Sequence, residues 1–289
     1  MMNCDMSRFL AYSFDFAGAQ MLGARENQQD FYAFVPPDQF EGRAVLCVLA
    51  DGMGGYEGGE IASECAVRAF VSVFLKDLVP EPDKLPEALS AANEAVGDAR
   101  LVSEKVRNMG TTLCAAYICG NFLHYISVGD SLIFLYRRGK LHRINRIHTI
   151  GQDLSEKLVE GRITLEEFDA EPQKNCLTSA LVGEPLLHVD YRSGIFMEPG
   201  DMILLSSDGI LTIGKESLAD CCRQCTPLSP AIQDVRNILD TVREVRSLRA
   251  EVEEDLMRVH KSFTVASALM SSEALEQALL YPKQSVELT

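Results

Sequence analysis

The chain has 289 residues, of which 47% are hydrophobic and none is tryptophan, so it can bury a sizeable core filled mainly by aliphatic side chains. Its formal net charge of -15 gives an acidic surface that repels nucleic acid and anionic membranes, and we expect neither as a partner. Surplus carboxylates commonly serve solubility, and they also leave room for bound cations. No run of about 18 uncharged apolar residues is present, and residues 1–14 lack the apolar centre of a signal peptide, which predicts a cytoplasmic protein.

The nine cysteines are scattered along the chain, and we expect them to be reduced. Cys47 and Cys114 lie in apolar runs, where a thiol behaves as a small hydrophobic side chain. Cys221, Cys222 and Cys225 form a cluster, but no further metal ligands follow nearby at suitable spacing. We therefore interpret the cysteines as structural or incidental thiols.

Strands and helices come in blocks in the first half of the chain. Residues 31–35 and 43–50 are predicted strands, and the second is almost continuously apolar, which is typical of a strand buried on both faces. Residues 60–78 place apolar side chains at three- and four-residue steps, which predicts a helix. Residues 85–109 predict a second helix or a pair of helices.

The middle of the chain changes to a strand pattern broken by short turns. It predicts one antiparallel meander with strands at 111–119, 122–128, 132–137 and 140–144. Residues 151–175 are polar and helix-prone, so we interpret them as an insertion between strands. Further along we predict strands at 176–181, 188–196, 202–206 and 263–269, a long amphipathic helical region at 229–259 and a short helix at 271–280. This block order predicts an α+β layered domain with antiparallel sheet at its core.

One aspartate follows the buried strand at 43–50 and lies on a glycine-rich turn. Asp51-Gly52 is well placed to meet a cation, because glycines let backbone carbonyls or a ligand approach closely. Taken alone, an Asp-Gly pair is more often a simple turn.

Three more aspartates occupy comparable places. Asp208 follows an apolar strand and precedes a glycine, Asp130 follows another strand, and Asp30 lies close in sequence to Arg25. Aspartates gathered from several strand ends suit a binuclear site of hard oxygen ligands for Mg²⁺ or Mn²⁺.

These motifs together resemble the metal-dependent protein serine/threonine phosphatases of type 2C, in their bacterial form. The matching segments run in the family's order along the chain, at residues 23–30, 50–55, 110–113, 128–131, 160–164, 175–181 and 199–209. Each motif is weak alone, and seven in the right order are specific. The resemblance implies two central antiparallel sheets flanked by helices, in a single domain over residues 1–289. Its core would cover about 13–270, with a flap at 151–175 and a tail at 271–289.

The resemblance also implies a role for each aspartate. Asp51 would bridge two metal ions, Mn²⁺ or Mg²⁺, and Gly52 would add its carbonyl oxygen. Asp208 would hold the first metal, and Asp30 would hold the site's waters or a further metal. Asp130 matches the position of a third, weaker metal.

Arg25 matches the arginine that grips the substrate phosphate in the family. The implied reaction is direct attack on phosphorus by a water whose pKa is lowered by the metals. The substrates implied are phosphoserine and phosphothreonine in proteins, either a Ser/Thr kinase or its targets.

Lys261 departs from the pattern most seriously, because it stands where the family has a metal-binding aspartate. An ammonium cannot coordinate a cation unless deprotonated, and it repels one. Glu253, Glu254 and Asp255 are weaker candidates to replace the lost ligand. Two interpretations therefore stay open: an active phosphatase, which we favour, and a catalytically impaired module that binds and regulates a phosphoprotein.

Milder departures are Leu132 for an arginine, Ile147 for an aspartate, and Thr212 near the place of another aspartate. His148, beside Ile147, is kept, and we interpret it as a structural histidine.

Overall fold

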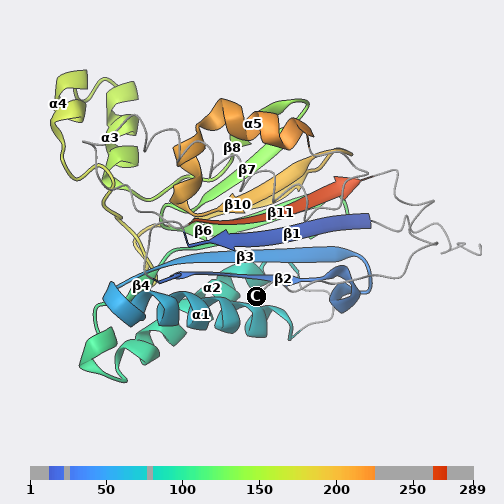
Figure 1. Cartoon of the computed structure of the whole chain (residues 1–289), viewed down its shortest axis with the longest axis horizontal. Coiled ribbons are helices and arrows are strands. Elements are labelled where there is room, and N and C mark those ends of the chain that lie inside the picture. Colours follow the sequence, from blue (N-terminus) through green and yellow to red (C-terminus); the bar gives the residue numbers. More distant parts are fainter. Residues whose placement is uncertain (1–12, 23–26, 77–80, 225–262, 272–289) are drawn as a thin grey trace, which may run out of the picture.

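The structure is a computed structural model that describes residues 13–22, 27–76, 81–224 and 263–271. Two antiparallel sheets lie face to face between helices (Figure 1). The five-stranded sheet has the spatial order β1 (Ser13–Met21), β11 (Phe263–Ser271), β10 (Met202–Ser206), β7 (Leu132–Arg137) and β8 (Lys140–Arg143). The other sheet has the order β2 (Asp30–Val35), β3 (Ala44–Met53), β5 (Leu113–Cys119), β6 (Phe122–Val128) and β9 (Asp190–Phe196), with β4 (Gly110–Thr111) paired to the end of β3. This architecture confirms the predicted α+β sandwich.

Strand β3 shows how the layers pack. Its even-numbered side chains, such as Leu46 and Val48, join a core cluster with the helices, and its odd-numbered ones, such as Cys47 and Leu49, join a second cluster between the sheets. Successive strand residues point to opposite faces, so a strand buried on both faces is apolar throughout. A third cluster lies between the five-stranded sheet and the segment η4 (Asp208–Ile213) with α5 (Lys215–Gln224).

Two helices cover the six-stranded sheet (Figure 1). Helix α1 (Gly55–Phe74) buries side chains four residues apart, including Ala62, Ala66 and Phe70, and it begins at Gly55 rather than at the predicted residue 60. Helix α2 (Lys84–Arg100) ends well before the predicted residue 109, because its apolar face ends at the exposed Leu101, and a 3-10 turn, η3 (Glu104–Val106), follows. None of the described helices combines the length and the apolar character needed to cross a membrane.

The prediction of one meander over residues 111–144 is wrong. Strands β5 and β6 pair in the six-stranded sheet, whereas β7 and β8 pair in the other sheet. The chain crosses between the sheets at Gly129–Ser131, where Gly129 has a φ of 96° that favours glycine. Alternation predicts strands but not their partners, because both sheets are antiparallel and share the same core. The crossing places Asp130 at one end of the sandwich, between the sheets.

Three other strand predictions need comment. Residues 176–181 form two isolated bridges, Thr149 with Leu177 and Thr111 with Leu181, rather than a strand. Strand β10 has the predicted bounds, and β11 contains the predicted 263–269. Strand β1 was not predicted, because small residues interrupt its pattern: a Cβ at Gly18 would lie 2.3 Å from the ring of Tyr32. The predicted helix at 229–259 lies outside the described residues, and so does the predicted helix at 271–280 except for Ser271, which ends β11.

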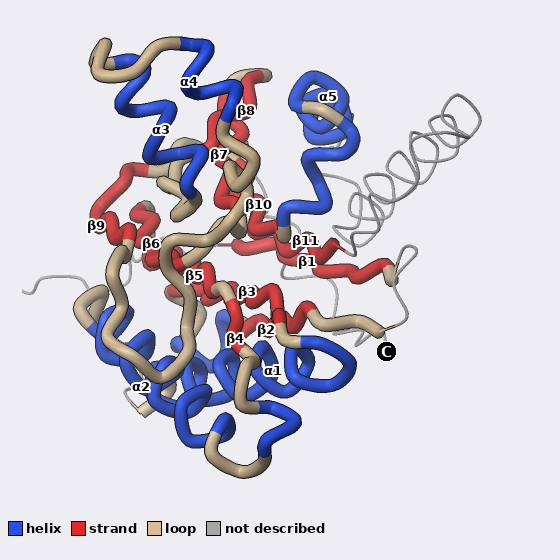
Figure 2. The backbone as a smooth tube through the Cα atoms, turned by 90° about the vertical axis from the view of Figure 1, so that its left-hand side faces the viewer, coloured by secondary structure: helices blue, strands red, loops and turns tan. Residues whose placement is uncertain are grey.

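The insertion at 151–175, the flap, is helical as predicted. Helix α3 (Ile150–Val159) is capped by Thr149, whose Oγ1 accepts a hydrogen bond from the backbone N–H of Gln152 at 3.1 Å. Helix α4 (Leu165–Ala170) begins with a capping box between Thr164 and Glu167. Both helices stand away from the sheets (Figure 2), and neither buries a side chain. The short 3-10 turn η2 (Pro37–Phe40) joins β2 to β3.

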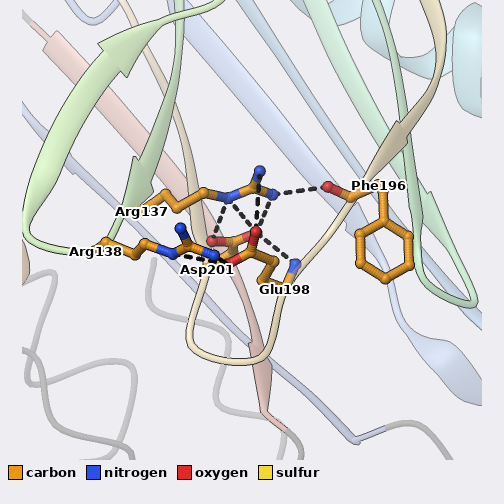
Figure 3. Close-up of polar contacts among 5 residues, drawn as sticks. All are labelled: Arg137, Arg138, Phe196, Glu198 and Asp201. Carbon is orange, nitrogen blue, oxygen red and sulfur yellow. Dashed lines mark hydrogen bonds and ion pairs between the residues drawn. The ribbon is translucent and has the colours of Figure 1, made fainter.

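A buried ion pair lies at the end of β7 that is remote from Asp130, and its arginine also contacts the other sheet. Figure 3 shows the residues involved. Arg137, the last residue of β7, donates from Nε to Asp201 Oδ1 at 2.9 Å and from Nη2 to the carbonyl of Phe196, in β9, at 2.7 Å. The Asp201 side chain is only 2% exposed, and it also accepts from the backbone N–H of Glu198. A buried carboxylate of this kind needs its partner, because removing one member leaves an uncompensated buried charge.

We therefore expect Arg137→Met to lower the free energy of unfolding by about 3 kcal/mol, measured by urea denaturation at neutral pH. Arg138→Met is the matched control, because the neighbouring Arg138 pairs with Glu198 but its side chain is 77% exposed. It should change stability by no more than about 0.5 kcal/mol. Equal losses in both variants would contradict a special role for the buried pair.

Candidate metal and phosphate site

Asp30 and Asp51 lie directly opposite each other on the adjacent strands β2 and β3. Opposed residues of an antiparallel pair project from the same face, with Cβ atoms about 5 Å apart. Asp51 continues the odd-numbered face of β3, which points between the two sheets. From the side of the five-stranded sheet, Ser207 Oγ donates a hydrogen bond to Asp30 Oδ2 at 3.1 Å. Asp30 is buried and Asp51 is half-buried, so the structure brings two of the predicted ligands together at one end of the sandwich.

Gly52 faces the opposite way, towards helix α1. A Cβ at Gly52 would lie 1.9 Å from the carbonyl oxygen of Gly59, so only glycine allows the first turns of α1 to pack against β3. The backbone N–H of Gly52 donates to the carbonyl of Gln29 at 3.0 Å, and Ser63 Oγ donates to the same carbonyl at 2.6 Å. The group that approaches Gly52 closely is therefore helix α1, where the sequence suggested a ligand. This packing of α1 against Gly52 fixes the position of the neighbouring Asp51.

Two threonines hold the backbone of Asp51, and the sequence interpretation gave them no role. Thr112 Oγ1 accepts from the N–H of Asp51 at 3.0 Å, and Thr111 Oγ1 donates to the carbonyl of Asp51 at 2.9 Å. Thr112 Oγ1 also lies 2.7 Å from Ser131 Oγ, next to Asp130. The pair of adjacent threonines after a helix was the available signal. They connect the strand that carries Asp51 to the crossing that carries Asp130.

Asp130 and Asp208 reach the same end of the sandwich from the five-stranded sheet. Ser206 of β10 pairs with Leu132 of β7 in an antiparallel register. Asp130 lies between β6 and β7, and Asp208 follows β10. Both side chains are half-buried. The four predicted aspartates therefore lie near strand ends at one end of the sandwich, and of the four the structure places Asp30 and Asp51 directly opposite each other.

The donor set fits a hard divalent cation. Carboxylates and a glycine carbonyl are the ligands of Mg²⁺ and Mn²⁺, which usually keep several waters. Within the described ranges, no three carboxylate, thiol or imidazole side chains gather closely enough to enclose an ion unaided. A metal here would therefore be held by few side chains and by water.

His148 supports the Gly129–Ser131 crossing. The ring Nδ1 of His148 accepts a hydrogen bond from the backbone N–H of Gly129 at 3.1 Å. The backbone N–H of His148 donates to the carbonyl of Gly129 at 2.8 Å. Its carbonyl accepts from the N–H of Thr178, beyond the flap. Burial lowers the pKa of His148 to about 4, with further lowering by the charges of Arg146 and His188. The neutral ring keeps Nδ1 as an acceptor, which agrees with the structural role predicted for His148.

This pKa makes stability depend on pH. The folded state leaves His148 neutral down to about pH 4, whereas the unfolded chain protonates it near pH 6.5, so stability falls as the pH drops from 6.5 towards 4. We expect His148→Asn, which keeps an acceptor for Gly129, to remove up to roughly 3 kcal/mol of that loss. Urea unfolding at pH 7 and pH 4.5 measures it. An unchanged pH dependence in His148→Asn would contradict the assignment.

Two of the milder departures have a common explanation. Leu132 is buried in the apolar cluster under α5, and Ile147 packs against the same cluster. Apolar residues thus occupy both positions where the family has charged ones, and both take part in the packing of this cluster. Cys221 and Cys222 are buried in this cluster as well, as expected of structural thiols.

Other predicted residues lie outside the described ranges. They are Arg25, the candidate phosphate ligand, Lys261, the cluster at 253–255 and Cys225.

Carboxylates paired at one end of a four-layer sandwich are the kind of site that a metal-dependent hydrolase uses. The family model described as protein phosphatase 2C matches residues 17–256. The chain therefore belongs to the protein phosphatase 2C family.

Curated relatives agree with this assignment. The chain is 38% identical over 173 residues to the serine/threonine protein phosphatase PstP of Mycobacterium tuberculosis, covering 58% of this chain and 32% of that relative. It thus spans about a third of PstP. It is 32% identical over 212 residues to the protein phosphatase PhpP of Streptococcus pneumoniae, covering 71% of this chain and 82% of the relative.

Solved structures match along most of the chain. A crystal structure of PstP from M. tuberculosis is 27% identical, with a TM-score of 0.69 over 89% of this chain and 99% of that one. The catalytic domain of PstP in complex with two manganese ions is also 27% identical, with a TM-score of 0.67 over 89% and 98%.

Proposed function

We propose that this chain hydrolyses phosphoserine and phosphothreonine in proteins, using a metal-activated water. The observation that carries the proposal is the opposed pair Asp30 and Asp51, held by Ser207 from one sheet and by Thr111 and Thr112 from the other. Membership of the phosphatase family and the two manganese ions of the PstP structure support it.

Each site residue has a proposed role. Asp51 would hold two ions, and Gly52 would add its carbonyl oxygen. Asp208 would hold the first ion, and Asp30 would order the site's waters or bind a further ion. Asp130 would serve a third, weaker site. When bound, Mn²⁺ or Mg²⁺ supplies a water of lowered pKa and offsets charge on the phosphate.

Arg25 would grip the phosphate with two parallel hydrogen bonds, because a guanidinium matches two phosphate oxygens. Proposed substrates are a phosphorylated Ser/Thr kinase or its targets, in the cytoplasm. The acidic composition argues against nucleic acid and membranes.

Lys261 favours a second function. With an ammonium in place of a ligand carboxylate, the first ion is held less firmly, and the chain would serve as a phosphoprotein-binding module of low activity.

The proposal is tested by phosphate release from a phosphothreonine peptide at millimolar Mn²⁺. Asp51→Asn should lower the rate by more than about 100-fold. Replacing a residue that only hydrogen-bonds to a metal ligand typically lowers metal affinity or activity by about 10- to 100-fold, and replacing the ligand itself should cost more. Asp38→Asn, at an exposed position of η2, should leave the rate unchanged. Wild-type protein that releases no phosphate would reject hydrolysis and favour the binding module.

Restoring the missing carboxylate tests the place of Lys261. Lys261→Asp should tighten Mn²⁺ binding about tenfold in calorimetry, because it exchanges a repelled ammonium for a ligand oxygen. Lys215→Asp, on the exposed start of α5, changes net charge equally and controls for general electrostatics. The same affinity in wild type and Lys261→Asp would place residue 261 away from the metals.

A further inference from the structure

We propose that Arg146 is a positioning residue for the flap, because it ties α3 to the sheets. The position of the flap then sets the affinity for phosphorylated proteins, whereas the affinity for small phosphate esters does not depend on it. This inference rests on the proposed phosphatase function and adds a determinant of substrate size to it. Arg146 belongs to neither the aspartate set nor the family's motifs.

The Arg146 guanidinium spans two carboxylates of α3. Its Nε donates to Glu156 Oε1 at 2.7 Å, and its Nη2 donates to Glu156 Oε2 at 2.9 Å and to Asp153 Oδ1 at 2.7 Å. Asp153 and Glu156 are three residues apart and so share one face of the helix. Hydrogen bonding to Glu156 raises the pKa of Arg146, and hydrogen bonding to Arg146 lowers the pKa of Glu156, so this contact stays charged at neutral pH.

The backbone of Arg146 is attached to the six-stranded sheet. Its N–H donates to Asp190 Oδ2, at the start of β9, at 2.7 Å. Tyr125 of β6 donates to the same oxygen at 3.2 Å and to the carbonyl of Ile144 at 2.7 Å. Arg146 therefore has its main chain on the sheet and its side chain on the flap.

The preceding residue fixes the same segment to the other sheet. Asn145 is buried, and its Oδ1 accepts from the N–H of Ile133, in β7, at 2.8 Å. Its Nδ2 donates to Ser127 Oγ at 3.2 Å and to the carbonyl of Ser131 at 2.9 Å. The segment that carries Arg146 is thus rigid and also borders the crossing beside Asp130.

Apolar packing contributes little to the angle of the flap. Neither α3 nor α4 has a fully buried side chain, although apolar residues of α3 such as Leu154 and Leu158 are half-buried. Backbone bonds join the base of the flap, such as Gly151 N–H to the carbonyl of Lys174 at 2.8 Å, but they leave the helices beyond it unattached. Arg143 Nη2 also donates a hydrogen bond to the uncharged side-chain oxygen of Gln152, at 2.9 Å. The ion-paired Arg146 is the strongest tie between α3 and the sheets.

The flap returns to the site through residues 175–182, which bridge Thr111 beside Asp51. A protein bound by its phosphorylated side chain must also fit against the flap, whereas an aryl phosphate occupies only the metal end. A loosened flap therefore weakens binding of the large substrate alone.

The test compares Arg146→Met with wild type on a threonine-phosphorylated protein and on para-nitrophenyl phosphate. KM for the protein should rise about fivefold, in keeping with the loss of a part-exposed ion-pair set, with kcat on both substrates within about twofold. Amide hydrogen exchange in residues 150–175 should become faster. Arg146→Lys, which keeps the charge but not the planar fork, should give an intermediate KM.

Arg138→Met is the matched control, because it removes another ion-paired surface arginine far from the flap, and it should change neither KM nor exchange. Equal losses on both substrates would show a merely structural role and overturn the proposal. Unchanged amide hydrogen exchange in residues 150–175 would overturn the proposal that Arg146 holds the flap, whether or not the protein is active. A wild-type protein that hydrolyses neither substrate would overturn the proposed function and this substrate role together, and the exchange result would still decide whether Arg146 holds the flap.

Discussion

The register between β2 and β3 places Asp30 opposite Asp51, and the candidate site is arranged around that pair. A slip of one residue would turn every side chain of one strand to the other face. Strand β3 prevents this, because its two faces pack into two different cores, and Gly52 admits α1 only in the observed register. The chemistry of the site therefore depends on apolar packing along the whole strand as much as on the aspartates themselves.

Different interactions join the sheets at the two ends of the sandwich. At the end with the aspartates, small hydroxyl groups make the connections: Ser207 to Asp30 and Thr112 to Ser131. At the other end, Arg137 pairs with the buried Asp201 and donates to the carbonyl of Phe196 in the other sheet. Short neutral side chains would leave room for ions and water beside the carboxylates.

Much of this arrangement could be predicted from the sequence, and the failures have physical causes. Strand β10 and the flap helices followed from local patterns, and the order of motifs indicated the family. Partner choice could not be predicted, because β6 and β7 have the same alternation whether they pair or separate at Gly129. The hydroxyl contacts of Thr112 were missed for a similar reason: a threonine between two strands suits many roles, and only the fold brings Ser131 to it.

The separation of the two ends bears on how such a chain can change over generations. Arg137 and Asp201 lie at the end of the sandwich away from Asp30 and Asp51. The residues that stabilise the fold there are therefore different from the residues proposed for catalysis. Replacement of a metal ligand, as we propose for Lys261, would then leave the folded protein stable and so protected from proteolysis. During evolution, single substitutions at the end with Asp30 and Asp51 can then convert an enzyme into a binding protein, or the reverse, while the fold is kept.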